Sequence, residues 1–182
     1  YDMECYEVDM AILTTAFNMS NELNVKICED HPGKFVALCT AQQTRSKAIL
    51  GEIDWTAEAA AKEIDDLLST SKYVGIGEGF PSDPKLGEKR TRIDRFERMD
   101  QIRCFMEVAR KYNVPVRWHT GICMGYTTTY AAGSGANPDT FNPMWVHDLA
   151  CENPDVPIIF EHGGVQAWWW EKWYEECLNV AA

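Results

Sequence analysis

Short apolar runs alternate with segments of helical periodicity along this chain. The runs cover residues 8–15, 34–41, 73–80, 114–121 and 156–164 and read VDMAILTT, KFVALCTA, YVGIGEGF, VPVRWHTG and VPIIFEHGG. Each run is mostly apolar at successive positions and ends in small or polar residues, which is typical of strands buried on both faces. The pattern predicts about five parallel strands covered by helices.

Apolar residues between these runs recur at the i, i+3, i+4 and i+7 spacing of one helix face. We expect helices over residues 57–68, 93–109, 144–151 and 168–177, and around residues 17–28. Strand–helix units in series imply right-handed crossovers, so the fold is either a doubly wound sheet or part of a (β/α)8 barrel. A complete barrel takes about 250 residues, whereas this chain has 182. A barrel built from it is therefore expected to be incomplete.

The composition indicates one soluble domain, a partial one covering residues 1–182. Apolar residues make up 46% of the chain and charged residues 25%, which is ordinary for a globular core. No run of 18 apolar residues is present, and residues 1–9 lack the basic and apolar regions of a signal peptide. The seven cysteines include no CxxC pair, as is usual for thiols in a reducing compartment. We expect a cytoplasmic protein without membrane contact.

The net charge limits the partners that we expect. Lys and Arg total 17 against 28 Asp and Glu, which gives a formal charge of −11. Because nucleic-acid binding depends on a basic face, we expect no nucleic-acid partner and instead a small-molecule substrate. Two macromolecular partners stay compatible with the sequence: further copies of this chain in a homo-oligomer, or barrel segments from the remainder of a longer protein.

Three potential metal ligands or catalytic groups stand where predicted strands end. His119, His162 and Glu78 each come directly before glycine or Thr-Gly. The carboxyl ends of parallel strands form the active-site edge of barrels and open α/β sheets. Imidazole and carboxylate together suit zinc, with manganese or iron as alternatives. Their placement at three strand ends predicts a divalent metal site near His119 and His162, with Glu78 as a candidate catalytic carboxylate.

Two roles for Glu78 stay open. The period of 2 along a strand places Arg117 on the face of His119, so Arg117 is a candidate partner for Glu78 in a buried ion pair. The alternative is that Glu78 contacts metal or substrate, and that Arg117, Thr120 and Gly163 bind substrate. His31, in a turn, and His147, within a helix, are expected to have surface or packing roles.

Several of these segments together resemble the amidohydrolase superfamily, in its amidohydrolase-related (type 2) branch. The segments that carry the resemblance are VDMAILTT, HPGKFVALCTA, VGIGEGF, ARKYNVPVRWHTG and NPMWVHDLACENPDVPIIFEHGG. The resemblance implies a metal-dependent (β/α)8 barrel, of which this chain covers strands 2 to 6. It also implies that His119 is a metal ligand and that His162 binds a second metal or acts as the catalytic base.

Members of this superfamily hydrolyse amides, esters or lactones, and several members of this branch remove CO2 from aromatic carboxylic acids. We therefore expect a metal-dependent hydrolase, with a non-oxidative decarboxylase as the alternative on the same fold. The tryptophans at 168–170 slightly favour decarboxylation of an aromatic acid. The family's His-x-His pair of strand 1 and Asp of strand 8 are missing from this sequence. We expect the chain alone to hold only part of the metal site.

Two further interpretations belong to other classes. One is a TatD-like metal-dependent DNase, a family that also has a GIGEGF-like strand. The net charge and the HGG segment make this DNase less favoured than the hydrolase and the decarboxylase. A non-catalytic truncated barrel that binds a partner is the other interpretation, because open edges at residues 8–15 and 156–160 would invite strand pairing.

Overall fold

The computed structural model describes residues 2–15, 19–77, 95–119, 144–164 and 172–181. Within these ranges five parallel strands form one sheet in the order of the chain. The strands are β1 (Ala11–Leu13), β2 (Phe35–Cys39), β3 (Gly75–Ile76), β4 (Val116–His119) and β5 (Ile158–Glu161). The order of the described strands never reverses, so the doubly wound alternative is excluded. The sheet curls into an incomplete (β/α)8 barrel with helices, as the sequence predicted.

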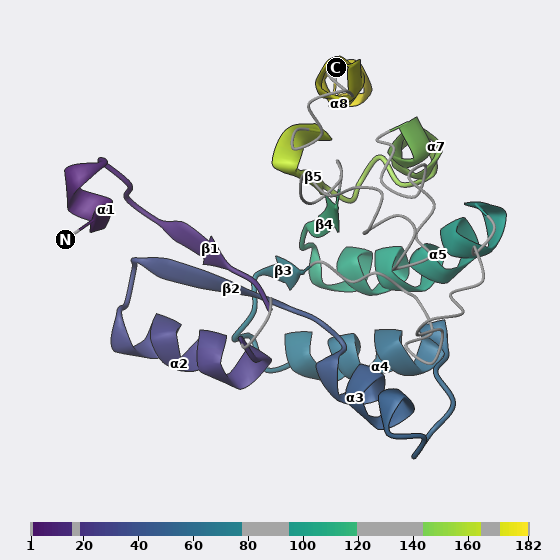
Figure 1. Ribbon diagram of the computed structural model, residues 1–182, viewed down its shortest axis with the longest axis horizontal. Helices are drawn as coiled ribbons and strands as arrows, with labels where there is room; N and C mark the ends of the chain where they lie inside the picture. The colour runs from purple at the N-terminus through teal and green to yellow at the C-terminus, as the bar shows by residue number, and fades with distance from the viewer. Residues whose placement is uncertain (1, 16–18, 78–94, 120–143, 165–171, 182) are drawn as a thin grey trace, which may run out of the picture.

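The described helices are α1 (Asp2–Cys5), α2 (Asn21–Asp30), α3 (Gln42–Ile49), α4 (Ala57–Leu68), α5 (Arg95–Tyr112), α7 (Met144–Glu152) and α8 (Lys172–Ala181). In Figure 1, helices α2, α3, α4, α5 and α7 follow one side of the strand array, whereas α1 lies beyond the start of β1. Helices α4, α5 and α7 lie where the apolar periodicity predicted them, α2 begins four residues later than expected, and the described part of α8 overlaps its predicted segment at residues 172–177. Helix α3 was not predicted, because its polar sequence buries only Thr44 and Ala48 and so lacks a recognisable apolar stripe.

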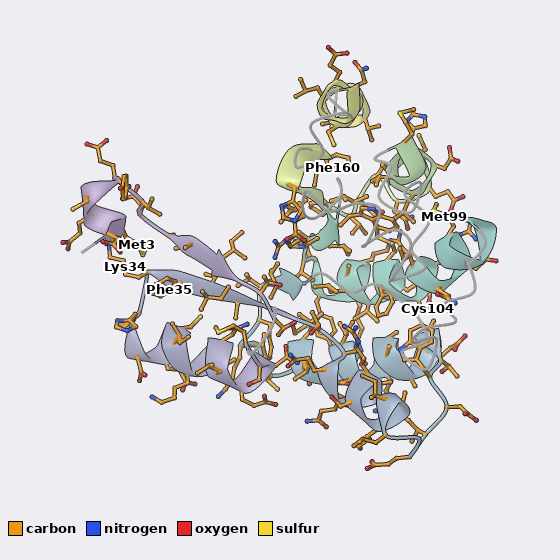
Figure 2. The ribbon with its side chains drawn as sticks, in the orientation of Figure 1. Met3, Lys34, Phe35, Met99, Cys104 and Phe160 are labelled. Carbon is orange, nitrogen blue, oxygen red and sulfur yellow. The ribbon has the colours of Figure 1, made fainter. Side chains whose placement is uncertain are left out.

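The hydrophobic core lies between the strands and the helices. Ala37, Cys39, Ile76, Val116 and Trp118 alternate along their strands and are at most 6% exposed. Buried side chains of α4 and α5 pack against them, and Figure 2 shows Met99 and Cys104 along α5. At the far edge of the sheet, Figure 2 places Phe160 on β5. Successive side chains of a strand point to opposite faces, so the residues between these positions lie on the concave side of the sheet.

The register across the sheet sets which residues share the concave side. Leu38 pairs with Gly75, Arg117 pairs with Ile159, and the backbone of His119 pairs with that of Glu161. A Cβ on Gly75 would come within 2.8 Å of Leu38 Cδ2 and 2.9 Å of the Pro115 carbonyl oxygen. Glycine therefore allows β2 and the start of β4 to approach the middle strand closely.

Local hydrogen bonds mark the ends of α4 and α5. Thr56 begins α4 by accepting a hydrogen bond from the Ala59 amide at 3.1 Å. Helix α5 ends at Asn113, which adopts the left-handed conformation with a φ of 53°, and the Val114 amide then donates to the Ala109 carbonyl at 3.1 Å. Across the described ranges, no helix combines the length and the apolarity needed to cross a lipid bilayer.

Candidate active site at the carboxyl edge of the sheet

Polar residues gather where the five strands end. The strands are parallel, so their carboxyl ends meet along one edge of the sheet. Thr14 and Thr15 follow β1, and Thr40 follows β2. His119 ends β4, and His162 follows β5 directly. The carboxyl edge therefore carries hydroxyl groups at its β1 side and ionisable groups at its β4–β5 side.

Hydrogen bonds hold the β1–β2 part of the carboxyl edge. The hydroxyls of Thr15 and Thr40 lie 2.6 Å apart. The buried Asn21 side chain, at the start of α2, donates to the Thr40 carbonyl at 2.7 Å and accepts from the Thr40 amide at 3.1 Å. A Cβ on Gly77 would lie 2.9 Å from Thr40 Cγ2 and 3.2 Å from Thr14 Oγ1. The polar groups on the β1–β2 side of the carboxyl edge are therefore closely packed and hydrogen-bonded to one another.

An ionic cluster occupies the β4–β5 part of the carboxyl edge. The Arg117 guanidinium donates a hydrogen bond to Oε1 of Glu161. The same carboxylate oxygen lies 3.3 Å from Nε2 of His162. The three side chains are 18%, 8% and 22% exposed, respectively. We call these three residues the Arg–Glu–His cluster; its carboxylate is buried because the two nitrogen groups surround it.

The backbone after β5 turns sharply at the cluster. His162 has a φ of 62° and Gly163 a φ of 54°, within the short 3-10 segment η3 (His162–Gly164). A left-handed conformation is costly for a residue with a Cβ, and such residues concentrate at functional sites. Among the described residues other than its two chain neighbours, no atom lies within 4 Å of the position of a Cβ on Gly163. The described part of the protein thus leaves space at Gly163.

The structure describes some of the predicted site residues and leaves others outside its described ranges. His162, Gly163 and Arg117 lie together at the carboxyl edge, and the backbone of His119 is in register with the residue before His162. Glu78 and Thr120 lie outside the described residues, so their roles stay predictions. His31 and His147 are exposed, which confirms the surface roles expected for them.

Sequence reasoning missed the residue at the centre of the cluster. It considered Glu78 as the partner of Arg117, whereas the structure pairs Arg117 with Glu161 on the adjacent strand. A signal was present, because Glu161 is an acidic residue inside an otherwise apolar run. A buried carboxylate in such a position requires a partner, and the register of β4 and β5 supplies it.

Cysteine does not provide a nucleophile at the end of β2. Burial raises the pKa of the Cys39 thiol to about 12, from an ordinary value of 9.0. Its Sγ lies 3.6 Å from the Gly75 carbonyl oxygen, to which it donates a weak hydrogen bond. Since the thiolate is the nucleophile and the metal ligand, Cys39 has a packing role.

The donor chemistry of the carboxyl edge fits a divalent metal. Metal-binding histidines commonly contact a carboxylate through the ring nitrogen that does not face the metal, and His162 Nε2 faces Glu161 in this way. Among the described residues, no group of three or more His, Cys, Asp and Glu side chains is placed to hold a metal ion. The side chains of His119 and Glu78 are not among those described, so the fit rests on His162 and Glu161.

A sequence model of the family described as Amidohydrolase matches residues 12–181. The match runs from within β1 through β5 and includes the carboxyl edge. No curated protein and no solved structure matches the chain.

Proposed function

Because the chain belongs to the amidohydrolase family, we propose that it is the catalytic domain of a metal-dependent hydrolase. In this proposal it cleaves an amide, ester or lactone bond of a small organic substrate. The observation that carries the proposal is the Arg–Glu–His cluster at the carboxyl edge, with His119 in backbone register beside it. A half-buried imidazole against a buried carboxylate is a frequent arrangement of catalytic and metal-binding histidines.

His119 and His162 are the residues that would hold the ion, with zinc favoured over manganese or iron for an imidazole-rich site. When bound, such an ion polarises a carbonyl group and makes water acidic enough to ionise near neutral pH. The residues of this chain orient the imidazole: Glu161 contacts His162 Nε2, and Arg117 neutralises the carboxylate and fixes its direction.

The remaining assignments complete the proposed site. His162, where it is not a ligand, holds or transfers a proton at the scissile group, with Glu78 as a second catalytic carboxylate. Arg117, Thr120 and Gly163 contact the substrate, and the open space at Gly163 gives it room. The tryptophans at 168–170, which slightly favour decarboxylation of an aromatic acid, lie outside the described residues, and decarboxylation stays the alternative reaction.

Paired histidine variants test this proposal. The chain, loaded with Zn²⁺, is assayed against an aryl ester, an anilide and a lactone, and its bound zinc is measured by equilibrium dialysis. We expect His162→Asn to lower kcat/KM at least about 100-fold, as the loss of a proton-transferring residue does, and to weaken zinc retention. The control His31→Asn removes an exposed histidine just before β2, at the opposite end of the strands, and should change neither.

Two results would overturn the proposal. One is a His162→Asn variant that hydrolyses as fast as the unmodified chain. The other is release of CO2 from aromatic carboxylic acids by a zinc-loaded chain that cleaves none of the three hydrolytic substrates, which would assign the decarboxylase reaction instead.

A further inference from the structure

A thiol and an imidazole stand together on α7, away from the residues of the candidate active site. Sγ of Cys151 lies 3.7 Å from Nε2 of His147. The two residues are four positions apart, so they lie one above the other on the same face of the helix. Both are exposed. Neither has a role in the proposed hydrolysis.

The spacing of the two donor atoms matches that of ligands to one tetrahedral ion. Zinc binds thiolate sulfur at about 2.3 Å and imidazole nitrogen at about 2.0 Å, and at the tetrahedral angle these lengths place the two donors about 3.5 Å apart. The observed separation is 3.7 Å. An ion at these bond lengths can therefore reach both atoms once the two side chains turn from facing each other to facing the ion.

Helix α7 holds this pair on a fixed support. Val146 and Leu149 are fully buried in the core on its opposite face. The buried Asn153 side chain donates to the Leu149 carbonyl at 2.9 Å, and Glu152 accepts two hydrogen bonds from Arg103, at 3.0 and 3.1 Å. Because α7 is held by its buried residues and by Arg103 of α5, it presents the two donors on its outer face.

The overall charge of the protein favours a cation. The chain as a whole has a formal charge of −11. Such a potential raises the local concentration of cations, and the pairing of thiolate with imidazole selects a thiophilic one.

We propose that His147 and Cys151 form a surface binding site for a thiophilic divalent cation of the zinc type. Two side chains supply ligands, since no larger donor group occurs among the residues that the structure describes, and water completes the coordination. Binding displaces the thiol proton to solvent, so that the sulfur coordinates as thiolate. A site with two protein ligands exchanges its ion readily, unlike the closed four-ligand sites of structural zinc.

Cobalt titration of the whole chain tests the site, with Co²⁺ as the probe because a cobalt–thiolate bond gives a charge-transfer absorption band. We expect the unmodified chain to show this band, Cys151→Ser to abolish it, and His147→Gln to weaken binding at least tenfold. Cys5→Ser is the matched control, because Cys5 is an exposed thiol on α1 with no imidazole contact in the described part of the chain. It should leave the band and the affinity unchanged. Zn²⁺ should displace Co²⁺ and remove the band.

Several results would overturn the site. They are a chain without a thiolate band at saturating Co²⁺, a band that survives Cys151→Ser, and a His147→Gln variant that binds as tightly as the unmodified chain. Any of them would leave a thiol–imidazole hydrogen bond without a metal function. The active-site histidines supply no thiolate, so their cobalt spectrum lacks this band. Failure of the proposed hydrolase activity and failure of this site are thus read out separately.

Discussion

Arg117 on β4 donates a hydrogen bond to Glu161 on β5, across two neighbouring parallel strands. The carboxylate is 8% exposed and the guanidinium 18%, so neither charge has water as its main partner. A buried ion pair contributes little net stability, but removal of one partner leaves the other charge uncompensated. The pair therefore makes the conformation of the candidate active site depend on both residues.

Removal of the Arg117 charge should destabilise the fold. We expect Arg117→Met to lower the free energy of unfolding by about 3 kcal/mol, because Glu161 then remains buried without a cation. Urea denaturation measures the change. The double variant Arg117→Met with Glu161→Met should recover most of the loss, because it buries no charge. In the control Lys62→Gln, which breaks an exposed pair with Asp66, the urea midpoint should hardly change. A double variant as unstable as the single one would contradict this explanation.

Two asparagines on α2 should respond to leucine in opposite directions. Asn24 is fully buried, and its amide group has no hydrogen-bond partner in the described part of the chain. Asn24→Leu should therefore raise the free energy of unfolding by about 1–2 kcal/mol, since an unsatisfied buried amide carries a desolvation cost. Asn21→Leu removes both hydrogen bonds to Thr40 and should lower it by at least about 1 kcal/mol. Thermal and urea unfolding of the two variants compare them, and destabilisation by Asn24→Leu would refute the prediction.

A methyl group at Gly75 should disturb the middle of the sheet. The added Cβ would lie 2.9 Å from the Pro115 carbonyl oxygen, and a backbone atom held by strand pairing cannot move aside cheaply. We expect Gly75→Ala to lower the free energy of unfolding by about 1–3 kcal/mol, the usual cost of overpacking. Gly33→Asn is the control, because Gly33 has open surroundings and a φ of 80°, a conformation that asparagine tolerates. Equal midpoints for the two variants in urea would exclude the proposed clash.

Stability should fall as the solution becomes alkaline. Burial raises the pKa of Cys39 to about 12, so the folded thiol keeps its proton at pH values where the unfolded thiol, with its ordinary pKa of 9.0, has lost it. The unfolded state then binds fewer protons, and the free energy of unfolding decreases above the ordinary pKa, by up to about 1.4 kcal/mol per pH unit. Below that pKa the contribution is fully present.

Cys39→Ala isolates this contribution. Urea denaturation in the pH window between the ordinary pKa values of cysteine and tyrosine should show a shallower decline for the variant than for the unmodified chain. At higher pH both proteins should decline, because burial also raises the pKa of Tyr73 to about 12, from an ordinary value of 10.0. Identical slopes for the two proteins in the lower window would show that Cys39 does not titrate in this way.

The apolar pattern of the sequence predicted the helices and strands that bury a regular set of apolar side chains. Helix α4 follows the spacing closely, with Ala60, Ile64 and Leu68 buried as expected. The strands were equally clear, because burial on two faces makes their runs apolar at nearly every position. Helix α3 lacks such a pattern: it is held at its start by Glu63, which accepts hydrogen bonds from the amides of Gln43 and Thr44 at 2.9 and 2.6 Å. A tertiary contact of that kind leaves no periodic signal.

The sequence predicted where the candidate active site lies, but it did not predict that Arg117 pairs with Glu161. Histidines at the ends of two predicted strands were sufficient to indicate the carboxyl edge. Which carboxylate meets Arg117 depends on the register between β4 and β5, and register is a property of paired strands that no single run of sequence contains. Glu161 therefore became recognisable as the partner only when the two strands were aligned.

Each described strand pairs only with the strands next to it in the chain, and this order has a consequence for biosynthesis. When each described strand after β1 is synthesised, the strand with which it pairs has already been made. Pairing of the two strands then requires only that the helix and loops between them fold, and it does not depend on residues synthesised later. The domain can then assemble progressively as it leaves the ribosome. Among the described strands the final pairing joins β5 to β4, and with it Glu161 reaches Arg117.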